Sequence, residues 1–500
     1  MANDARSSRV TVAGGTVEGR IRDGVASFLG VPYAAPPFGP NRMLPPQPVV
    51  PWPDVRDAGR MGPTVPKGDY PPVFQRLFLE EEIEGEECLN VNVWTPDPGA
   101  SGLPVLVWIH GGAFLNGSNS VAAYDGSGFA RSGVVCVTVN YRLAAEGFLF
   151  LDDDASNLGL RDQLAALEWV RENIVAFGGD AGNVTLAGES AGAMSIATLL
   201  AMPSAAGLFA RAVTQSGAAA NTLTAEQGLA VSTLLAHTLD VPHTRSAIAA
   251  VPPDRLVAAA SQVFAEIQTD ADPAKWGSLA LSGLPFAPVI DGTVLPVHPL
   301  DAARAGRSAS VPLLTGWNRD EDRLFLVAAN MLDAIDEAAL FDKARTYGLK
   351  PEAIEIYRAA RPGATPGDLL AAVGTDWVFA IPALRYAEAR VAGGAASTWV
   401  YRFDHLEPAD NDGFGACHAT EVPFVFRTEG HDSVRALIGA RPSTEAAATA
   451  HDAWVSFART GTPGWEPYDT TRRPTALIAE KIRVVDDPAP DERRAWDGIR

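Results

Sequence analysis

The chain has 500 residues, 47% of them hydrophobic and 20% charged, which is typical of a globular protein with a large core. Its net charge of −20 excludes nucleic acid and anionic membranes as favourable partners, because their phosphates repel an acidic surface. No run approaches the ~18 consecutive apolar residues of a membrane span, and residues 1–10 lack the apolar segment of a secretory signal, so we expect a cytoplasmic protein without membrane contact.

The first part of the chain is expected to form strands. Residues 9–33 contain short apolar runs separated by Gly-Gly and Asp-Gly pairs, which are typical turn sequences. Two continuous apolar runs follow at residues 105–109 and 134–139. Such runs indicate strands that are buried on both faces, as in a parallel sheet.

From residue 158 onward the pattern alternates between helices and strands. Apolar residues recur every three or four positions over 158–177, which predicts a helix, and a strand at 184–187 and a helix at 191–202 follow. This order is typical of an open α/β sheet. Later strands are expected at residues 210–214, 311–315, 398–402 and 482–485.

The long intervals 220–305 and 325–395 are Ala-rich and mostly helical in pattern. We expect them to be helical insertions that cover one edge of the sheet and form pocket walls. No internal repeat, low-complexity linker or charge block divides the chain. The prediction is therefore one α/β domain over residues 1–500, with a mostly parallel twisted sheet flanked by helices.

Residues 110–114, His-Gly-Gly-Ala-Phe, follow the predicted strand at 105–109 and resemble the glycine-rich oxyanion motif of esterases. Glycines let successive backbone N–H groups face a substrate oxygen without a Cβ in the way. The expected donors are the N–H groups of Gly112, Ala113 and Ala191, the last one from the helix that begins at residue 191. The alternative is a plain glycine turn.

The nucleophile candidate is Ser190, within the sequence Gly-Glu-Ser-Ala-Gly at residues 188–192. This sequence fits G-x-S-x-G, in which a serine occupies a sharp turn between a strand and a helix. An apolar strand precedes Ser190 and an apolar helix follows it, as that turn requires. The context favours a serine nucleophile over a serine that only caps the helix.

A serine hydroxyl attacks only when a base takes its proton, and the base needs an acid that orients it. With a serine on this kind of turn, the chain order is serine, acid, histidine, which excludes His110 as the base. Three carboxylates directly follow the strand at 311–315, and spacing does not choose among them: Asp320, Glu321 and Asp322.

Four downstream histidines remain as base candidates: His405, His418, His431 and His451. His418 lies in a glycine-rich loop that suits a mobile base, and we expect it within hydrogen-bond distance of Ser190. His405 follows the strand at 398–402 more closely and is the competitor. His431 and His451 are expected at the surface.

Several blocks of the sequence resemble the type-B carboxylesterase family, which includes cholinesterases and bacterial para-nitrobenzyl esterases. Residues 177–192, FGGDAGNVTLAGESAG, are close to that family's nucleophile signature, and residues 86–94, EECLNVNVW, resemble its second signature. Residues 30–34 and 215–217 match further blocks, so the resemblance covers about residues 9–485. It implies an α/β-hydrolase fold and the hydrolysis of carboxylic esters.

The resemblance also selects an acid and a base. The family's acid lies in G-x-N-x-D-E-G, which residues 316–321 match, and its histidine precedes x-x-Glu, which His418 and Glu421 match. A triad of Ser190, Glu321 and His418 is therefore implied. By the same matching, three residues resemble the family's buried polar network beside the triad: Glu189, Ser216 and Glu421. Two pairs resemble its structural ion pairs: Arg42–Glu86 and Arg142–Asp162.

The sequence departs from the family pattern at two positions. Asp322 stands where the family usually has glycine after the acid, which adds a negative charge near Glu321. The disulfide partner of Cys88 is missing, since Val65 occupies its position. The cysteines, three in number and without C-x-x-C spacing, are expected to be reduced thiols rather than metal ligands.

The resemblance implies broad activity on uncharged esters of short to medium chain length, with no metal or organic cofactor. Carbamate, amide or thioester hydrolysis on the same scaffold is the alternative, and a non-catalytic adhesion relative is a remote one, because such relatives typically lack triad residues. Four aromatic residues are candidate pocket walls, and each position also fits the core: Phe114, Phe325, Trp377 and Phe414.

Overall fold

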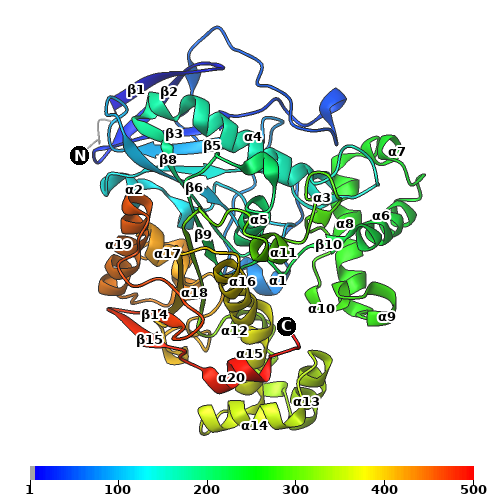
Figure 1. Ribbon diagram of the computed structural model, residues 1–500. Helices are drawn as coiled ribbons and strands as arrows, with labels where there is room; N and C mark the ends of the chain where they lie inside the picture. The colour runs from blue at the N-terminus through cyan, green and yellow to red at the C-terminus, as the bar shows by residue number, and fades with distance from the viewer. Residues whose placement is uncertain (1–5) are drawn as a thin grey trace.

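A twisted sheet of thirteen strands runs through the computed structural model, which describes residues 6–500 (Figure 1). The strands lie in the order β1-β2-β3-β5-β7-β6-β8-β9-β12-β13-β14-β15, and β4 pairs with β2. Neighbours from β7 to β14 are parallel, and the other neighbours in this order are antiparallel, while β4 pairs with β2 in parallel. The predicted mostly parallel sheet flanked by helices is confirmed.

The strands of this sheet have the following bounds: β1 (Arg6–Val12), β2 (Gly15–Arg22), β3 (Val25–Pro32), β4 (Arg56–Asp57), β5 (Asn90–Thr95), β6 (Leu103–Ile109), β7 (Val135–Val139), β8 (Gly179–Glu189), β9 (Arg211–Gln215), β12 (Leu313–Asn318), β13 (Thr398–Phe403), β14 (Pro474–Ile478) and β15 (Ile482–Asp486). A separate short pair consists of β10 (Leu223–Thr224) and β11 (Val289–Ile290).

The central strands are the apolar runs that the sequence predicts. Every residue of β7 and β12 is buried, because helices cover both faces of the sheet. Strand β5 was not predicted, since its sequence alternates Asn with apolar residues. Asn90 and Asn92 are fully buried there, and their side chains donate hydrogen bonds to backbone carbonyls, including that of Asn119.

Helices flank the sheet and fill both predicted insertions. The first insertion contains α6 (Ala225–Leu239), α7 (Arg245–Ala249), α8 (Pro253–Thr269), α9 (Pro273–Trp276), α10 (Leu279–Ser282) and α11 (Pro299–Arg304). The second contains α12 (Arg323–Ala328), α13 (Glu337–Thr346), α14 (Pro351–Ala360), α15 (Pro366–Thr375) and α16 (Ile381–Ala392). Figure 1 shows α6 to α10 in green on one side of the molecule and α13 and α14 at its lower end.

The other helices are α1 (Pro72–Gln75), α2 (Ser127–Arg131), α3 (Ala144–Phe148), α4 (Leu158–Asn173), α5 (Ala191–Leu199), α17 (Glu421–Phe426), α18 (Arg435–Ile438), α19 (Thr444–Thr460) and α20 (Pro490–Ala495). Helices α4 and α5 correspond to the predicted helices at 158–177 and 191–202. In α5 every residue is buried, so this helix packs in the core beside β8 and β9.

One stretch of the described chain is long and apolar enough to cross a membrane. It runs over Pro366–Ala392 and joins α15 and α16 through the π-helical turn Asp376–Ala380. Within the fold, 78% of its most apolar window is buried. Its apolar character is therefore accounted for by packing inside the protein.

Of the two predicted ion pairs, one is confirmed and one is wrong. Nη2 of Arg142 lies 2.7 Å from Oδ1 of Asp162, and both side chains are buried. Nη2 of Arg42 instead lies 2.7 Å from Oε1 of Glu146, a residue of α3, while Glu86 is exposed. The three cysteines are free and buried.

Candidate active site

The predicted active-site residues all follow the carboxyl ends of neighbouring parallel strands. Ser190 follows β8, the loop at 110–114 follows β6, and Glu321 follows β12. His418 lies in the loop between β13 and α17. In an open α/β sheet this edge is where binding sites form, because the strand ends leave a crevice that loops from several strands surround.

Ser190 occupies a strained turn between β8 and α5. Its backbone has φ 55° and ψ −124°, a conformation that residues with a side chain rarely adopt. Its N–H donates a hydrogen bond to the carbonyl of Gln215 at 2.9 Å, which anchors the turn to the end of β9. The side chain is half-buried, as a nucleophile that meets both base and substrate requires.

The glycine-rich loop packs directly against this turn. A methyl group at Gly111 would lie 2.9 Å from Cβ of Ser190, so only glycine fits there. Gly112 has φ +111°, and a methyl group on it would lie 2.1 Å from the carbonyl oxygen of Asn116. Ala113 also has a positive φ of 56°. The loop is therefore held in a conformation that brings its backbone against the serine.

Three backbone N–H groups at this junction have no acceptor within residues 6–500. They belong to Gly112, Ala113 and Ala191, the residues predicted as oxyanion donors. Unused donors beside a serine are what an oxyanion site requires, because the developing charge is stabilised by N–H groups that have no internal acceptor.

The acid and base predicted by family resemblance are in contact. Nδ1 of His418 lies 2.6 Å from Oε2 of Glu321, and both side chains are buried. The other carboxylate oxygen of Glu321 accepts a hydrogen bond from the N–H of Asn318 at 2.7 Å. The N–H of His418 donates to the carbonyl of Glu321 at 3.2 Å. These bonds fix the direction in which the imidazole points.

The expected hydrogen bond between His418 and Ser190 is not formed in the described chain. Nε2 of His418 lies instead 3.1 Å from Oε1 of Glu189, the residue before the serine. Both Glu189 and His418 are buried, so charge attraction between them is screened little by water. The imidazole therefore lies between two carboxylates.

Burial and charge act in opposite directions on these groups. Burial lowers the pKa of His418, but the carboxylates of Glu189 and Glu321 outweigh this effect and raise it to about 9. Burial raises the pKa of Glu189 to about 8 despite the attraction of His418. The pKa of Glu421 is also raised by burial and by the neighbouring Glu321. The site thus favours a protonated imidazole near neutral pH.

Glu421 belongs to a polar network that the sequence identified only in part. Its carboxylate accepts hydrogen bonds from Gln215 at 2.9 Å and from the side chain of Asn318 at 2.5 Å. Trp454 in turn donates to Gln215 at 2.7 Å. The hydroxyl of Ser216 is buried and has no partner within residues 6–500.

Asn318 and Gln215 were missed because neither residue is ionisable. Both lie in sequence blocks that the family resemblance identified, at residues 316–321 and 215–217. The signal that could have found them is their place at the last position of β12 and of β9, where a side chain reaches the crevice.

The competing acids and bases have other partners. Asp320 pairs with Arg319 at 3.0 Å. Asp322 lies against Gly374, and burial raises its pKa to about 7. His405 pairs with Glu480 at 3.0 Å, so it points away from the triad.

The remaining histidines differ from one another. His431 is exposed as expected, but the expectation of a surface position for His451 is wrong. His451 is buried, and its ring contacts the hydroxyl of Ser132 at 2.8 Å and the carbonyl of Val425 at 2.7 Å. Among residues 6–500, no group of three His, Cys, Asp or Glu side chains is placed to hold a metal ion.

Only one of the four candidate pocket aromatics lies beside the triad. Phe325 is 38% exposed, and its ring centre lies 5.9 Å from that of His418. Phe379, which was not predicted, lies closer, at 4.6 Å from His418. Phe74 contacts Phe325 edge to face at 6.0 Å and extends the aromatic wall.

The other three aromatics pack in the interior. Phe114 has no exposed surface and contacts Phe148 edge to face at 4.9 Å. Phe414 is also fully buried, in the core cluster on the other face of the sheet. Trp377 stacks on Tyr347 at 4.8 Å and is covered by the guanidinium of Arg500. Large apolar side chains fit either a core or a pocket, so sequence could not separate these cases.

Comparison with known proteins gives consistent matches over the whole chain. A family model described as "Carboxylesterase family" matches residues 6–494. The para-nitrobenzyl esterase of Bacillus subtilis is 38% identical over 502 residues, which cover 97% of both proteins. The phenmedipham hydrolase of Pseudarthrobacter oxydans is 34% identical over 461 residues, covering 90% of this chain and 89% of that protein. The crystal structure of a Geobacillus stearothermophilus carboxylesterase at pH 6.2 matches with a TM-score of 0.84 and 37% identity, covering 98% of this chain and 99% of that one.

Proposed function

Since this chain belongs to the carboxylesterase family and is a carboxylic ester hydrolase, we propose that it cleaves its substrates in two steps through an acyl-enzyme on Ser190. In the first step His418 takes the proton of the Ser190 hydroxyl, and the oxygen attacks the ester carbonyl. The carbonyl oxygen gains a negative charge as the tetrahedral intermediate forms.

The N–H groups of Gly112, Ala113 and Ala191 would receive this charge. When the intermediate collapses, the bond to the alcohol oxygen breaks and His418 returns the proton to the leaving alcohol. Water then attacks the acyl group with His418 again as base, which releases the carboxylic acid and restores the serine. Glu321 orients the imidazole and stabilises its protonated form.

The observation that carries this proposal is the 2.6 Å contact between Nδ1 of His418 and Glu321, at the strand ends that also hold the strained Ser190. A carboxylate bound to Nδ1 leaves Nε2 as the atom that exchanges protons. The hydrogen bond from serine to base often tightens only when substrate binds, so the contact of Nε2 with Glu189 is compatible with this assignment.

We further propose uncharged esters of short to medium chain length as substrates. The buried carboxylate of Glu321, which contacts His418, would repel an anionic substrate. The aromatic wall of Phe325 and Phe379 offers an apolar surface beside His418. Both features favour a neutral, partly apolar molecule.

Carbamate, amide or thioester cleavage would use the same residues and is the alternative. The relative named phenmedipham hydrolase is a reason to measure it. Turnover of matched aryl ester, aryl carbamate and anilide substrates distinguishes ester hydrolysis from carbamate and amide hydrolysis. A higher kcat/KM for the ester supports the proposal. A higher kcat/KM for the carbamate or the anilide would contradict it and make that substrate class the preferred one.

The acyl-enzyme proposal is tested by trapping. A labelled organophosphate ester should abolish activity at one equivalent and be recovered on the peptide that contains Ser190. A mixing experiment with p-nitrophenyl acetate should separate acylation from deacylation as a burst of p-nitrophenol. Loss of activity with the label on another residue, or no labelling at all, would refute Ser190 as nucleophile.

We also propose a cytoplasmic location. Three free, buried cysteines and the lack of the family's disulfide partner for Cys88 support a reducing compartment. Fractionation of the source cells with an antibody against the protein tests this, and recovery outside the cytoplasmic fraction would contradict it.

A further inference from the structure

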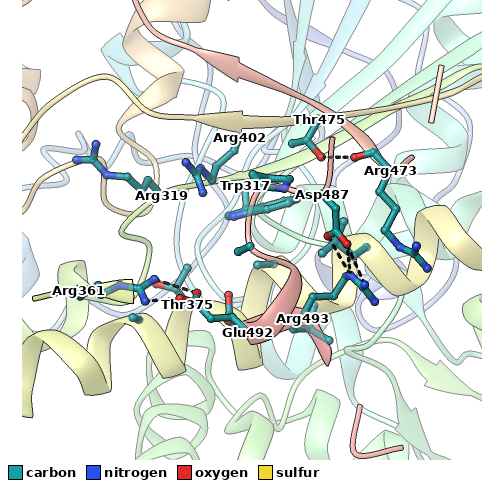
Figure 2. Close-up of a pocket in the computed structure, with 17 residues that line it drawn as sticks. Trp317, Arg319, Arg361, Thr375, Arg402, Arg473, Thr475, Asp487, Glu492 and Arg493 are labelled. Atoms are coloured by element: carbon teal, nitrogen blue, oxygen red, sulfur yellow. Dashed lines mark hydrogen bonds and ion pairs between the residues drawn. The ribbon is translucent and has the colours of Figure 1, made fainter. Parts of the chain in front are cut away.

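A cavity that none of Ser190, Glu321 and His418 lines contains Trp317 of β12 in its wall (Figure 2). Successive side chains of a strand point to opposite faces, and here Asn318 joins the polar network of Glu421 while Trp317 lines this cavity. Segments far apart in the sequence meet around it, from β12, α15, α16, β13, β14 and α20. No step of the proposed ester hydrolysis uses it.

Arginine dominates the lining of this cavity. Seventeen residues line it, and five of them are Arg319, Arg361, Arg402, Arg473 and Arg493. The carboxyl groups in the lining are those of Asp376, Asp487 and Glu492. Such a concentration of guanidinium groups stands out in a chain whose net charge is −20.

Two of these arginines use only part of their hydrogen-bonding capacity. Nε and Nη2 of Arg402 donate to Asp404 at 2.6 Å and 2.8 Å. The same two nitrogens of Arg493 donate to Asp487, at 3.0 Å and 2.9 Å. Within residues 6–500, Nη1 of neither arginine has an acceptor.

Arg473 is the most weakly paired of the set. Its Nε and Nη2 both lie 3.4 Å from the same oxygen of Glu388, at the long limit of a hydrogen bond. Glu388 also accepts a shorter bond of 2.9 Å from Arg385. The Nη1 of Arg473 likewise lacks an acceptor in the described chain, so this side chain can turn to an external one.

The backbone around the cavity is irregular in three places. Arg473 has φ 54° and Asp487 has φ 45°, and the N–H of Asp487 donates to the carbonyl of Arg473 at 3.1 Å. The π-helical turn Asp376–Ala380 contributes two lining residues. Strained non-glycine residues and π-helical turns cost stability and concentrate at functional sites.

The acidic lining residues do not cancel the free guanidinium donors. Asp487 and Glu492 are already occupied by the side chains of Arg493 and Arg361. Burial and the neighbouring Glu492 raise the pKa of Asp376 to about 7, so this carboxyl loses much of its charge near neutral pH. Its Oδ2 accepts a hydrogen bond from the hydroxyl of Tyr357.

We propose that this cavity binds a small oxyanion, a carboxylate or a phosphate, on the unused N–H groups of Arg473 and Arg493, which lie on the same side of Trp317 in Figure 2. The space open to the centres of water molecules is about 60 Å³. At ~10–15 Å³ for each water this corresponds to roughly four to six waters, which is the scale of a free phosphate or a short carboxylate rather than of a nucleotide. Arginine suits this ligand because its planar fork matches two oxygens of a carboxylate or phosphate.

The site adjoins the segment that carries the triad acid. Thr375 lines the cavity, and its Oγ1 accepts the N–H of Asp322 at 3.1 Å. Trp317 precedes Asn318, whose N–H donates to Glu321. A ligand in the cavity therefore contacts the supports of the acid loop without reaching Ser190.

The binding test uses the full chain with Ser190→Ala, so that binding is measured independently of ester turnover. Sodium phosphate, sulfate, acetate and succinate are each compared with chloride at constant ionic strength, by calorimetric titration and by thermal unfolding. We expect at least one oxyanion to bind saturably and to raise Tm by about 2 °C or more. The comparison of acetate with phosphate identifies which oxyanion the site prefers.

Arg473→Gln and Arg493→Gln should each raise Kd about tenfold or more. The matched control is Arg304→Gln, since Arg304 pairs with Asp301 at an exposed position, and it should leave Kd unchanged. If Arg493→Gln does not fold, Arg493→Lys keeps the charge and removes the fork, and it should weaken binding as well. Absence of saturable binding up to about 10 mM, or equal binding by the arginine variants and the control, would overturn the proposal.

Discussion

Nε2 of His418 lies 3.1 Å from Oε1 of Glu189, while Nδ1 of the same ring lies 2.6 Å from Oε2 of Glu321. The imidazole is therefore held between two buried carboxylates, one on each nitrogen. This arrangement favours the positive imidazolium, which is the form that develops in the transition state of ester cleavage. It also means that the resting base must lose a proton before it can accept one from Ser190.

The rate of ester hydrolysis should rise with pH. The carboxylates raise the pKa of His418 to about 9, so the neutral imidazole increases as pH rises through that value. Below the pKa, kcat/KM should increase about tenfold per pH unit. Turnover of p-nitrophenyl acetate between pH 6 and pH 9, corrected for spontaneous hydrolysis, measures this. A rate that stays flat over that range would contradict a histidine base.

Glu189→Gln should move this profile to lower pH. Removing the carboxylate 3.1 Å from Nε2 removes one of the two charges that stabilise the imidazolium, and the midpoint should fall by about 1 unit. The midpoint of the pH–rate profile depends on the charge near His418 and not on the amount of folded protein. It therefore distinguishes an electrostatic role of Glu189 from a purely structural one. Glu355→Gln, on the exposed face of α14, is the control. An unchanged midpoint in Glu189→Gln would show that Glu189 carries no charge in the working enzyme.

Ser190→Ala should abolish turnover. If Ser190 and His418 act as one unit, loss of either should lower kcat about 10⁶-fold. Ser310→Ala, at an exposed position without hydrogen bonds in the described chain, should keep full activity. Full turnover of p-nitrophenyl acetate by the purified Ser190→Ala protein would end the assignment of the nucleophile.

Gly112→Ala should lower kcat with little change in KM. A methyl group there would meet the carbonyl of Asn116 at 2.1 Å and would strain a φ of +111°, so the loop must shift its N–H groups. Loss of one oxyanion donor typically costs about 10²–10³ in kcat. Gly430→Ala is the control, because no atom lies within 4 Å of the added methyl group. Equal kcat in the two variants would place the oxyanion donors elsewhere.

Asp162→Asn should destabilise the fold strongly. Arg142 and Asp162 form a buried pair, and breaking it leaves an uncompensated charge, which costs about 3–5 kcal/mol of the free energy of unfolding. Asp342→Asn removes an exposed partner of Arg345 and should have no measurable effect. Urea unfolding of both variants makes the comparison. A similar loss of unfolding free energy in both variants would mean that the buried Arg142–Asp162 pair contributes no more than the exposed Arg345–Asp342 pair.

The elements whose conformation is local follow from the sequence alone. The apolar runs that became β6, β7 and β12 and the turn at Ser190 were predicted because periodicity, glycine placement and strand length are properties of neighbouring residues. The acid and the base needed the family resemblance, since spacing alone left three carboxylates and four histidines open.

Contacts between distant segments were decided only by the tertiary structure. Arg42 pairs with Glu146 instead of Glu86, and His451 is buried beneath Ser132, because packing brings α3 and α2 to those side chains. The placement of Glu189 against His418 has the same origin. Sequence patterns specify which conformations a segment prefers, whereas the distance between two side chains hundreds of residues apart depends on how all the intervening elements pack together.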